Sequence, residues 1–518
     1  MRRATAAGLA LATTARLALA LVAGLALALV AAVPAAAAGT VTVGSKAFPE
    51  SWILGEGLAS LTRATGVPEV RHRSNLGGTE IVYQALRAGD VDVYPEYTGT
   101  IAEVLLQDPG RPSLEAMRRT LAARGIGISA PLGFNDSYAL AVSADTQRRY
   151  QLRTISDLAR HPDLRFGLTH EFIGREDGFP GLARRYDLSS RNVRGIQHEL
   201  AYEAIASGKV DVIDIYTTDA QIEHLDLRVL DDDRGFFPRY DAVWLYRLDL
   251  EHREPRALAA MRRLEGRIDE AAMIRANARV VLERVPFAQS ADSLLLEALG
   301  AAGGATAARE GLWRALLADT AQHLRLVAIS LLAAILVGVP LGVLATRSRP
   351  LAAVTLSAAG LLQTIPSLAL LAFLIPLLGI GVRPALVALF LYSLLPIVRN
   401  TYTGIATIPA ALTESAAAIG LSPGAQLFRV RLPMASPAIM AGIKTSAVIN
   451  VGTATLAALI GAGGLGDPIL SGIQLRRTSL ILQGAIPAAL LALLVQWGFE
   501  LLDRIAIPRG LRLPSEPT

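Results

Sequence analysis

The chain reads Glu414-Ser-Ala-Ala-Ala-Ile-Gly420 and, after nine further residues, Val430-Arg-Leu-Pro433. This stretch lies between two long apolar segments and combines small helix-forming residues with a glycine and a proline. The residues predict a short helix, a turn at Gly420 and a second short helix that stops near Pro433 and Pro437. Such an elbow could dock in a groove of a cytosolic partner. A plain amphipathic connector between two spans is the alternative.

Five apolar segments surround this elbow, and each is long enough to cross a bilayer. The predicted spans are 322–345, 352–378, 384–405, 436–461 and 479–502. If the first span runs inward, most arginines between and after the spans fall on the cytoplasmic side, as the positive-inside rule requires. Pro366, Pro376 and Pro396 lie within spans, where neighbouring helices can satisfy the freed backbone groups.

The composition changes near Glu310, where acidic residues nearly vanish and apolar residues take over. The 52% hydrophobic content and mean hydropathy of +0.40 exclude an entirely soluble chain. We expect five regions: a signal peptide or N-terminal anchor (1–38), an extracytoplasmic domain (40–300), a linker (301–318), a transmembrane domain (319–507) and a cytoplasmic tail (508–518). The apolar N-terminal run leaves cleavage and anchoring both open.

Several classes of function find no support in the residues. The chain has no cysteine, which excludes disulfides and thiolate metal sites. Its net charge of +5 comes from scattered arginines without a basic block, so we expect no nucleic-acid partner. Its seven histidines show no metal spacing, and no pairing of a nucleophile with a base stands out, so we expect no catalytic residue and no metal. The pattern G-x-x-x-x-G-K-[ST] does not occur, so the chain cannot hydrolyse ATP through a phosphate loop.

Residues 40–300 alternate β-rich and helical runs, which is typical of an α/β domain with mainly parallel sheets. Val41–Val43, Val91–Tyr94 and Val210–Ile213 are strand-like, whereas Glu80–Ala88 and Tyr202–Ser207 are helical. About 260 residues favour two lobes with a cleft between them over a single core.

The Glu414 to Pro433 stretch resembles the coupling loop of ABC importer permeases. Ser415 is the only departure in its opening triplet, and it is a small-for-small change. The resemblance implies a separate ATPase subunit that docks on this loop and uses the ATP, with no cofactor bound by the chain itself, and a homodimer through the permease domain in the lipid bilayer. The coupling residues it assigns are Glu414, Ala416, Gly420, Leu432 and Pro433.

The run from Val451 to Ile460 resembles permeases of the glycine betaine, carnitine and choline group. The following Gly461-Ala-Gly-Gly-Leu-Gly466 fits the pattern G-x-G-x-x-G, but it follows a spanning helix and no βαβ unit surrounds it. We therefore interpret it as a closely packed turn rather than a nucleotide site.

The binding half resembles solute-binding proteins for compatible solutes across nearly all of residues 41–300. The matching runs are Gly44–Lys46, Asn75–Thr79, Tyr94–Thr100, Gly133–Tyr138, Glu171–Arg175, Asp214–Asp219 and Phe237–Asp241. The resemblance implies a fold of two parts: an α/β, two-lobed, type II periplasmic-binding-protein-like domain and an all-α transmembrane ABC permease domain with about five spans.

The same resemblance assigns the ligand site. Tyr97, Tyr138, Tyr216 and Tyr240 would form a cage around a trimethylammonium group, with Asp136 adding negative character. A quaternary ammonium has no proton to donate, so electron-rich ring faces suit it. The contacts to a ligand carboxylate map onto Lys46, Thr100 and Arg175. A salt bridge of Arg175 with Glu171, Glu176 or Asp177 is the alternative.

We therefore expect one subunit of an ABC importer for a quaternary-ammonium zwitterion such as glycine betaine. It would lie in the bacterial cytoplasmic (inner) membrane with its solute-binding domain outside the cytoplasm. An ergothioneine importer of the same architecture and a membrane-tethered betaine sensor without transport are the alternatives. The residues do not choose among glycine betaine, proline betaine, carnitine, choline and ergothioneine, because the cage reads only their shared head group.

Overall fold

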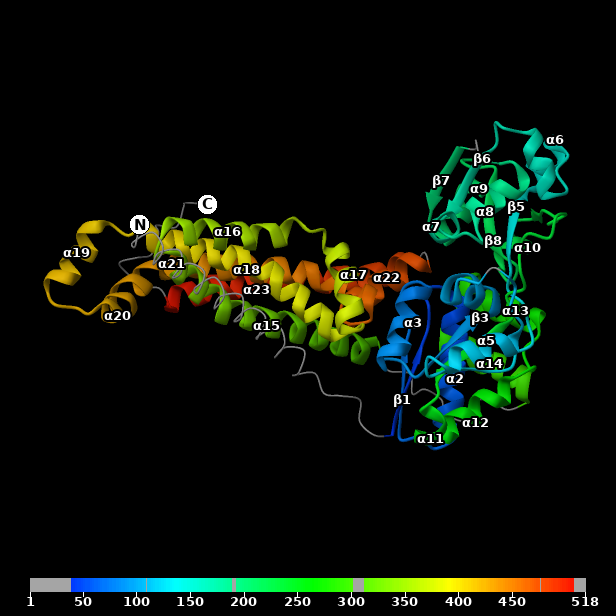
Figure 1. The fold of residues 1–518 in the computed structure, drawn as a ribbon, viewed down its shortest axis with the longest axis horizontal. Helices are drawn as coiled ribbons and strands as arrows, with labels where there is room; N and C mark the ends of the chain where they lie inside the picture. The colour runs from blue at the N-terminus through cyan, green and yellow to red at the C-terminus, as the bar shows by residue number, and fades with distance from the viewer. Residues whose placement is uncertain (1–38, 109, 189–191, 301–311, 476, 507–518) are drawn as a thin grey trace. The chain divides into compact units, whose positions relative to one another are not determined.

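A computed structural model describes residues 39–108, 110–188, 192–300, 312–475 and 477–506 (Figure 1). The N-terminal signal peptide or anchor (1–38), residues 301–311 of the predicted linker and the tail (508–518) lie outside the described residues. The described chain divides into an α/β unit, which includes residues 39–300, and a helical unit that begins at Leu312; Ser471–Arg477 groups with the α/β unit. Each unit is described by itself.

The first lobe of the α/β unit is built on a five-stranded sheet in the order β2-β1-β3-β10-β4. Strand β1 is parallel to β2 and β3, whereas β10 is antiparallel to β3 and β4. The strands are β1 (Thr40–Gly44), β2 (Glu69–Arg73), β3 (Val93–Tyr97), β4 (Ile126–Ile128) and β10 (Ala242–Arg247). The helices are α2 (Pro49–Ala64), α3 (Thr79–Ala88), α4 (Thr98–Thr100), the π-helix η1 (Ile101–Leu106), α5 (Leu114–Ala122), α11 (Leu250–Arg253), α12 (Pro255–Leu264), α13 (Glu270–Val281) and α14 (Phe287–Leu299).

The second lobe repeats this plan with the order β7-β6-β8-β5-β9. Strand β6 is parallel to β7 and β8, and β5 is antiparallel to β8 and β9. Its strands are β5 (Tyr138–Ser143), β6 (Arg165–Thr169), β7 (Asn192–Ile196), β8 (Val212–Tyr216) and β9 (Leu227–Val229). Its helices are α6 (Ala144–Tyr150), the 3-10 helix η2 (Ile155–Arg160), α7 (His170–Gly174), α8 (Phe179–Tyr186), α9 (His198–Ala206) and α10 (Gln221–His224).

The chain crosses between the lobes twice, before β5 and again before β10. The two crossing segments pair with each other through an antiparallel bridge between Asn135 and Asp241. Because β5 and β10 each enter a lobe from this crossing, they run against their neighbours, and the sheets are mixed rather than mainly parallel as predicted. The two-lobed α/β prediction itself is confirmed, and the strand order of both sheets is that of the type II binding-protein fold.

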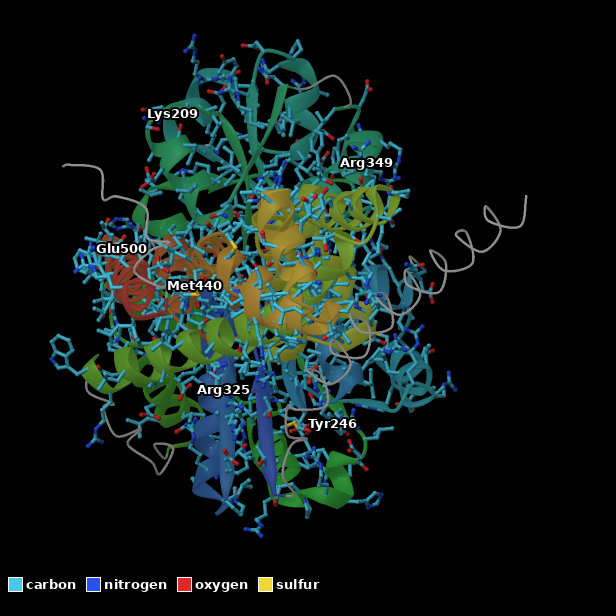
Figure 2. All side chains as sticks on the ribbon, turned by 90° about the vertical axis from the view of Figure 1, so that its left-hand side faces the viewer. Lys209, Tyr246, Arg325, Arg349, Met440 and Glu500 are labelled. Atoms are coloured by element: carbon cyan, nitrogen blue, oxygen red, sulfur yellow. The ribbon has the colours of Figure 1, made fainter. Side chains whose placement is uncertain are left out.

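The described helices of the other unit include four that are long and apolar enough to cross a membrane. They are α15 (Leu312–Ala345), α18 (Val382–Ala406), α21 (Leu432–Ala454) with the elements joined to it, and α23 (Thr478–Ala506). Because α15 begins at Leu312, the last part of the predicted linker is helical. Figure 2 labels Arg325 of α15, Met440 of α21 and Glu500 of α23.

The predicted span 352–378 is not one straight helix. Helices α16 (Arg349–Thr364) and α17 (Ser367–Leu378) meet at 95°, so this pair counts as a fifth span only if it crosses as a bent unit. Pro366 explains the break, since it disfavours helical backbone at Ile365, which is extended with ψ 123°. The hydroxyl of Tyr392 donates to the freed carbonyl of Ile365, as the apolar surroundings require.

The elbow between α18 and α21 contains α19 (Ala410–Ala418) and α20 (Pro423–Gln426), and Figure 1 shows both at the opposite end of the helices from α17. Gly420 turns the chain with φ +83°, as predicted. The second short helix does not stop at Pro433 or Pro437: through the π-helical turn η3 (Leu427–Arg431) it continues into α21. Pro433 lies in the first turn of α21, where its missing N–H costs little.

The glycine run after α21 forms a turn between the 3-10 helix η4 (Thr455–Ile460) and α22 (Gly466–Gln474). Gly461, Gly463 and Gly464 have φ of +71°, +78° and +94°, which favours glycine at each position. A Cβ on Gly466 would lie 2.0 Å from the carbonyl oxygen of Thr455. Backbone conformation and close packing therefore explain these glycines, as predicted.

Candidate functional site

The four tyrosines predicted to form a cage come together at one place between the two lobes. Tyr97 ends β3 and Tyr216 ends β8, whereas Tyr138 opens β5 and Tyr240 lies just before β10. Tyr138 and Tyr216 are also direct partners in the antiparallel ladder of β5 and β8. Strand ends at the edge of such sheets are where ligands of α/β proteins bind, so the sheet topology explains why distant tyrosines meet here.

The rings form a continuous aromatic box, to which Phe48 adds a fifth member. The ring centroid of Tyr138 lies 5.2 Å from that of Tyr216 and 5.6 Å from that of Tyr240, the latter at an interplanar angle of 84°. Phe48 bridges the lobes, with centroids 6.2 Å from Tyr97 and 5.7 Å from Tyr216. The box is lined by Lys46, Phe48, Tyr97, Thr100, Asp136, Tyr138, Glu171, Arg175, Tyr216 and Tyr240.

Lys46 lies on the wall of this box and already has a carboxylate partner. Its Nζ donates to Glu96 Oε1 at 2.6 Å, and both side chains are buried. The same Nζ lies 5.0 Å from the ring centroid of Tyr97 and 5.5 Å from that of Phe48. An ammonium group of the protein therefore lies over two ring faces of the box.

Arg175 lines the box, where a contact to the ligand carboxylate was predicted, and it also forms salt bridges, which was the alternative prediction. Its guanidinium donates to both oxygens of Asp177, at 2.8 Å from Nε to Oδ1, and at 3.2 Å from Nη1 to Glu171 Oε1. Nη2 also donates to the Thr100 hydroxyl at 3.4 Å, which joins the two lobes. Two carboxylates thus occupy much of the fork that would grip a ligand carboxylate.

A buried group of carboxyls lies behind the rings. Glu50, near the start of α2, accepts hydrogen bonds from the Tyr97 hydroxyl at 2.5 Å, the Thr218 hydroxyl at 2.6 Å and Asn277 Nδ2 at 3.1 Å. The Thr218 hydroxyl also lies 2.8 Å from Asp136 Oδ1. Burial, together with the charge of Glu50, raises the pKa of Asp136 well above its usual value, and burial likewise raises the pKa of Glu50.

Tyr216 is held from behind by a charged network. Asp219 Oδ2 accepts from the Tyr216 backbone N–H at 2.8 Å, the Tyr202 hydroxyl at 2.6 Å and His198 Nε2 at 2.9 Å. The His198 ring packs on Tyr216 with centroids 4.5 Å apart. Burial opposes a charge on His198, but the carboxylate of Asp219 outweighs it and raises the pKa of His198 to about 9.

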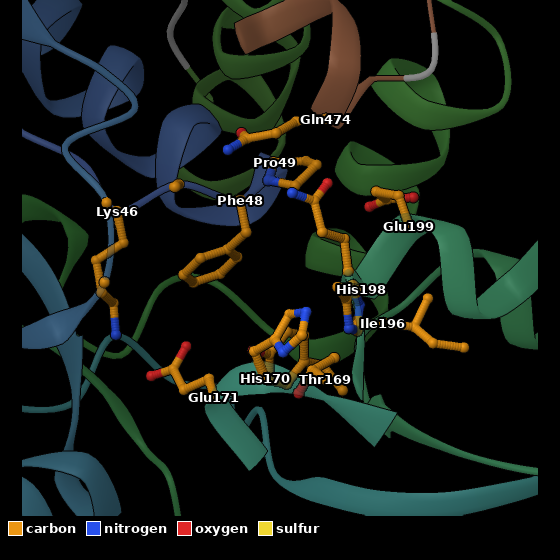
Figure 3. A pocket seen from close by; sticks show the side chains of 15 residues that line it. Lys46, Phe48, Pro49, Thr169, His170, Glu171, Ile196, His198, Glu199 and Gln474 are labelled. Carbon is orange, nitrogen blue, oxygen red and sulfur yellow. The ribbon is translucent and has the colours of Figure 1, made fainter. Parts of the chain in front are cut away.

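The cleft continues from the box into a wider pocket, drawn in Figure 3. Phe48 reaches into it, with Lys46 and Glu171 on one side and His170 and His198 on the other. Lys46, Phe48, Glu171 and Tyr216 line both spaces, so the box and this pocket adjoin each other.

Beside the box, Ser45, His72 and Glu56 have the spacing of a nucleophile, a base and its orienting acid, a pairing that sequence reasoning did not find. Ser45 Oγ lies 2.7 Å from His72 Nε2, and His72 Nδ1 lies 2.8 Å from Glu56 Oε2. Ser45 is fully buried and donates its own hydrogen to the carbonyl of Ser51 at 2.7 Å. The hydroxyl therefore accepts from His72 instead of giving it a proton, which is the wrong direction for a nucleophile.

The coupling residues predicted from the sequence all lie in the elbow or at its exit. Glu414 and Ala416 are on α19, Gly420 is the turn, and Leu432 and Pro433 open α21. Two apolar side chains of the elbow are strongly exposed: Ile419 at 77% and Phe428 at 70%. The elbow therefore presents apolar groups that its own unit does not cover.

Phe48, Glu50 and Asp177 are the residues of the site that sequence reasoning missed. Phe48 directly precedes α2, and Glu50 looks like an ordinary acidic residue in a first helical turn. Asp177 was considered only as a salt-bridge partner of Arg175, although it also accepts from the Tyr240 hydroxyl at 2.7 Å. The short spacing from Lys46 to Glu50, directly after a predicted strand, is a signal that could have found Phe48 and Glu50.

Comparison with known proteins covers both units. Residues 39–295 match the family described as the substrate binding domain of the ABC-type glycine betaine transport system, and residues 338–507 match the binding-protein-dependent transport system inner membrane component. The choline transport system permease protein OpuBB of Bacillus subtilis is 46% identical over 201 residues, which are 39% of this chain and 93% of the relative.

A second relative is itself named for both functions. The ergothioneine transport permease/ergothioneine binding protein EgtU of Helicobacter pylori is 36% identical over 268 residues, which are 50% of this chain and 48% of that protein. A crystal structure of a glycine betaine/carnitine/choline ABC transporter aligns with a TM-score of 0.43 and 30% identity, covering 49% of this chain and 97% of that one.

Permease domains of this description are inner-membrane components, so the chain is a multi-pass protein of the bacterial cytoplasmic membrane with its substrate-binding domain outside the cytoplasm. One polypeptide carries both matches, so the substrate-binding domain and the permease domain are fused. The chain belongs to the ABC importers of the glycine betaine, carnitine and choline type, as a fused substrate-binding and permease subunit.

Proposed function

We propose that the box binds the trimethylammonium head group of a glycine betaine-like zwitterion, which the permease domain then carries inward. The observation that supports this is the convergence of five aromatic rings from both lobes on one space. A cation that cannot donate hydrogen bonds is held best by ring faces, at about 0.5–2 kcal/mol per ring according to desolvation. Tyr97, Tyr138, Tyr216 and Tyr240 supply those faces, and the buried carboxyl pair of Asp136 and Glu50 behind them carries one negative charge.

Lys46, Thr100 and Arg175 are the proposed contacts of the ligand carboxylate. Because Lys46 already lies over the rings of Phe48 and Tyr97, the ligand head group has to displace this ammonium. The displaced ammonium is then free to meet the carboxylate end of the same ligand. A zwitterion thus replaces one cation on the rings by another and supplies Lys46 with a new partner.

Ergothioneine is the second candidate. It is a histidine betaine, so it carries the same trimethylammonium group, and the relative EgtU is named for it. The pocket that continues from the box is lined by polar side chains of His170, Gln197 and His198, which suit a ligand with a polar ring. Neither feature supports a sensor without transport.

Transport needs energy, which we propose comes from ATP hydrolysed by a separate ATPase subunit docked on the elbow from Glu414 to Pro433. The exposed side chains of Ile419 and Phe428 would supply the apolar contacts of that interface. We further propose that two copies of the chain pair through their permease domains, which gives a homodimer with two binding domains.

The test is ligand-induced stabilisation of the full-length chain in detergent against glycine betaine, proline betaine, carnitine, choline and ergothioneine. At a hundred times its dissociation constant, a true ligand stabilises the folded state by about 2.7 kcal/mol. Tyr138→Ala and Tyr216→Ala should each weaken binding at least about tenfold. Tyr150→Ala, which changes a tyrosine outside the box, should leave affinity unchanged. Stabilisation by none of the five compounds would falsify the proposal.

A further inference from the structure

Two of the four cage tyrosines donate their hydroxyl hydrogen to a buried carboxylate. The Tyr97 hydroxyl lies 2.5 Å from Glu50 Oε1, and the Tyr240 hydroxyl lies 2.7 Å from Asp177 Oδ2. Glu50 is 3% exposed and Asp177 is 5% exposed. In both pairs the carboxylate lies at the hydroxyl end of the tyrosine side chain, and the tyrosine itself lines the box.

The donors around Glu50 show where the negative charge lies. Thr218 has one hydroxyl hydrogen, yet its oxygen lies within hydrogen-bond distance of both Glu50 and Asp136. One of the two carboxyls must therefore carry a proton and donate it to Thr218. Apart from this shared hydroxyl, Glu50 accepts from the Tyr97 hydroxyl and the Asn277 amide, whereas Asp136 accepts from the Thr218 backbone N–H at 3.2 Å, so the ionised form is better satisfied at Glu50 and the proton at Asp136.

The charge on Glu50 has no cationic partner among the described residues that contact it. Its hydrogen-bond donors are Tyr97, Thr218 and Asn277, all of which are neutral. Lys46 is paired with Glu96, and Arg175 is paired with Asp177 and Glu171. A buried carboxylate without a counter-ion is costly, and a cation in the adjacent box would lower that cost.

The hydrogen bond also changes the ring itself. Hydrogen bonds in a chain polarise one another, so a phenol that donates to a carboxylate gains electron density. The negative face of an aromatic ring is what attracts a cation, and a more electron-rich ring attracts it more strongly. A neutral group of the same shape gains nothing from either effect.

We propose that Glu50, acting through the hydroxyl of Tyr97, is the residue by which the box distinguishes a positively charged head group from a neutral one of equal shape. Asp177 acts on Tyr240 in the same way. Glu50 is not among the residues that line the box, so it is a positioning and charge-tuning residue behind the cage. This inference rests on the proposed function of the box and deepens it: selection is for permanent charge and not only for the size of three methyl groups.

The experiment compares two probes on the full-length chain in detergent: glycine betaine and 3,3-dimethylbutanoate, in which carbon replaces the ammonium nitrogen. The measured quantity is the ratio of their dissociation constants. Glu50→Gln keeps the shape of the side chain and should reduce the preference for glycine betaine about fivefold or more. Tyr97→Phe keeps the ring but breaks the hydrogen bond, and should reduce the ratio in the same direction.

The double variant decides whether the two residues act as one unit. If they do, Glu50→Gln combined with Tyr97→Phe should lose little more than either change alone. Glu251→Gln is the matched control, because Glu251 accepts from the Tyr246 hydroxyl at 3.0 Å in a similar pair whose residues do not line the box. It should leave the ratio unchanged.

The outcomes separate the two levels of the proposal. If the wild-type chain binds no trimethylammonium compound, the proposed function fails. If it binds glycine betaine but Glu50→Gln and Tyr97→Phe leave the ratio as it was, the proposed function stands and the role of Glu50 is refuted. Since Tyr97→Phe retains the buried carboxylate, it still tests the inference if Glu50→Gln does not fold.

Discussion

The pair of His198 and Asp219 behind the cage makes folding stability depend on pH in a calculable way. His198 Nε2 lies 2.9 Å from Asp219 Oδ2, with side chains only 15% and 14% exposed. Glu199 and Asp214 add negative potential at the ring, so the pKa of His198 rises from 6.5 to about 9. The perturbation we consider is His198→Gln, which keeps a hydrogen-bond donor but cannot be charged.

The sign follows from proton linkage. Between pH 6.5 and about 9 the folded chain holds a proton on His198 that the unfolded chain has lost, so stability decreases as pH rises. The contribution is fully present below pH 6.5 and is lost as pH passes the folded pKa. A difference of about 2.5 pKa units corresponds to about 3 kcal/mol at 1.36 kcal/mol per unit.

The assay is thermal unfolding of the full-length protein in detergent, followed by tryptophan fluorescence. Of the four tryptophans, Trp52 and Trp244 are buried in the α/β unit and should report its unfolding, whereas Trp313 and Trp497 are already exposed. The melting temperature of the wild type should fall between pH 6.5 and 9 by roughly 2–4 °C per kcal/mol lost. His198→Gln should start lower and change less over this range. His252→Gln, which alters an exposed histidine, should follow the wild type. Parallel curves for wild type and His198→Gln would refute the charge assignment.

Three further predictions concern the site, the glycine turn and the elbow. Affinity for glycine betaine should fall on acidification, beginning above the pH at which an ordinary glutamate titrates, because burial raises the pKa of Glu50 and a protonated Glu50 no longer favours a cation; isothermal titration across pH 4–8 measures this, and a flat profile speaks against it. Gly466→Val should destabilise the permease helices by several degrees in a melting assay, since even a Cβ would lie 2.0 Å from the Thr455 carbonyl oxygen; an unchanged melting temperature would show that the turn can relax. Ile419→Asp should abolish uptake in proteoliposomes with the partner ATPase and leave glycine betaine affinity intact, and normal uptake would place the interface elsewhere.

The sequence predicted the architecture well wherever a pattern is local. Apolar length predicted the spans, the alternation of strand and helix predicted the α/β class, and the length of about 260 residues predicted the two lobes. The motif resemblance predicted that Tyr97, Tyr138, Tyr216 and Tyr240 meet at one place, and in the structure all four line one space, where Phe48 connects the ring of Tyr97 to that of Tyr216. The roles assigned to these residues remain predictions.

What the sequence could not provide depends on contacts between distant segments. Glu50 becomes a buried carboxylate only because Thr218 and Asn277 arrive from far along the chain. Composition alone predicted a single span over 352–378. In the structure, the proline that follows Ile365 disfavours helical backbone there, and the two helices meet at 95°. The mixed sheets likewise follow from the return crossing before β10, which hydrophobic alternation does not reveal.

The two crossing segments between the lobes have a consequence for how long cargo stays bound. A double connection, pinned by the bridge of Asn135 to Asp241, allows bending about one axis and resists twisting. Tyr138 and Tyr240 adjoin this axis, whereas Tyr97 and Tyr216 end strands of opposite lobes. If the four rings enclose a ligand as proposed, it can leave only after the lobes have bent apart. Its residence time would then depend on how often the two crossing segments bend, and the ring contacts would make that bending rarer.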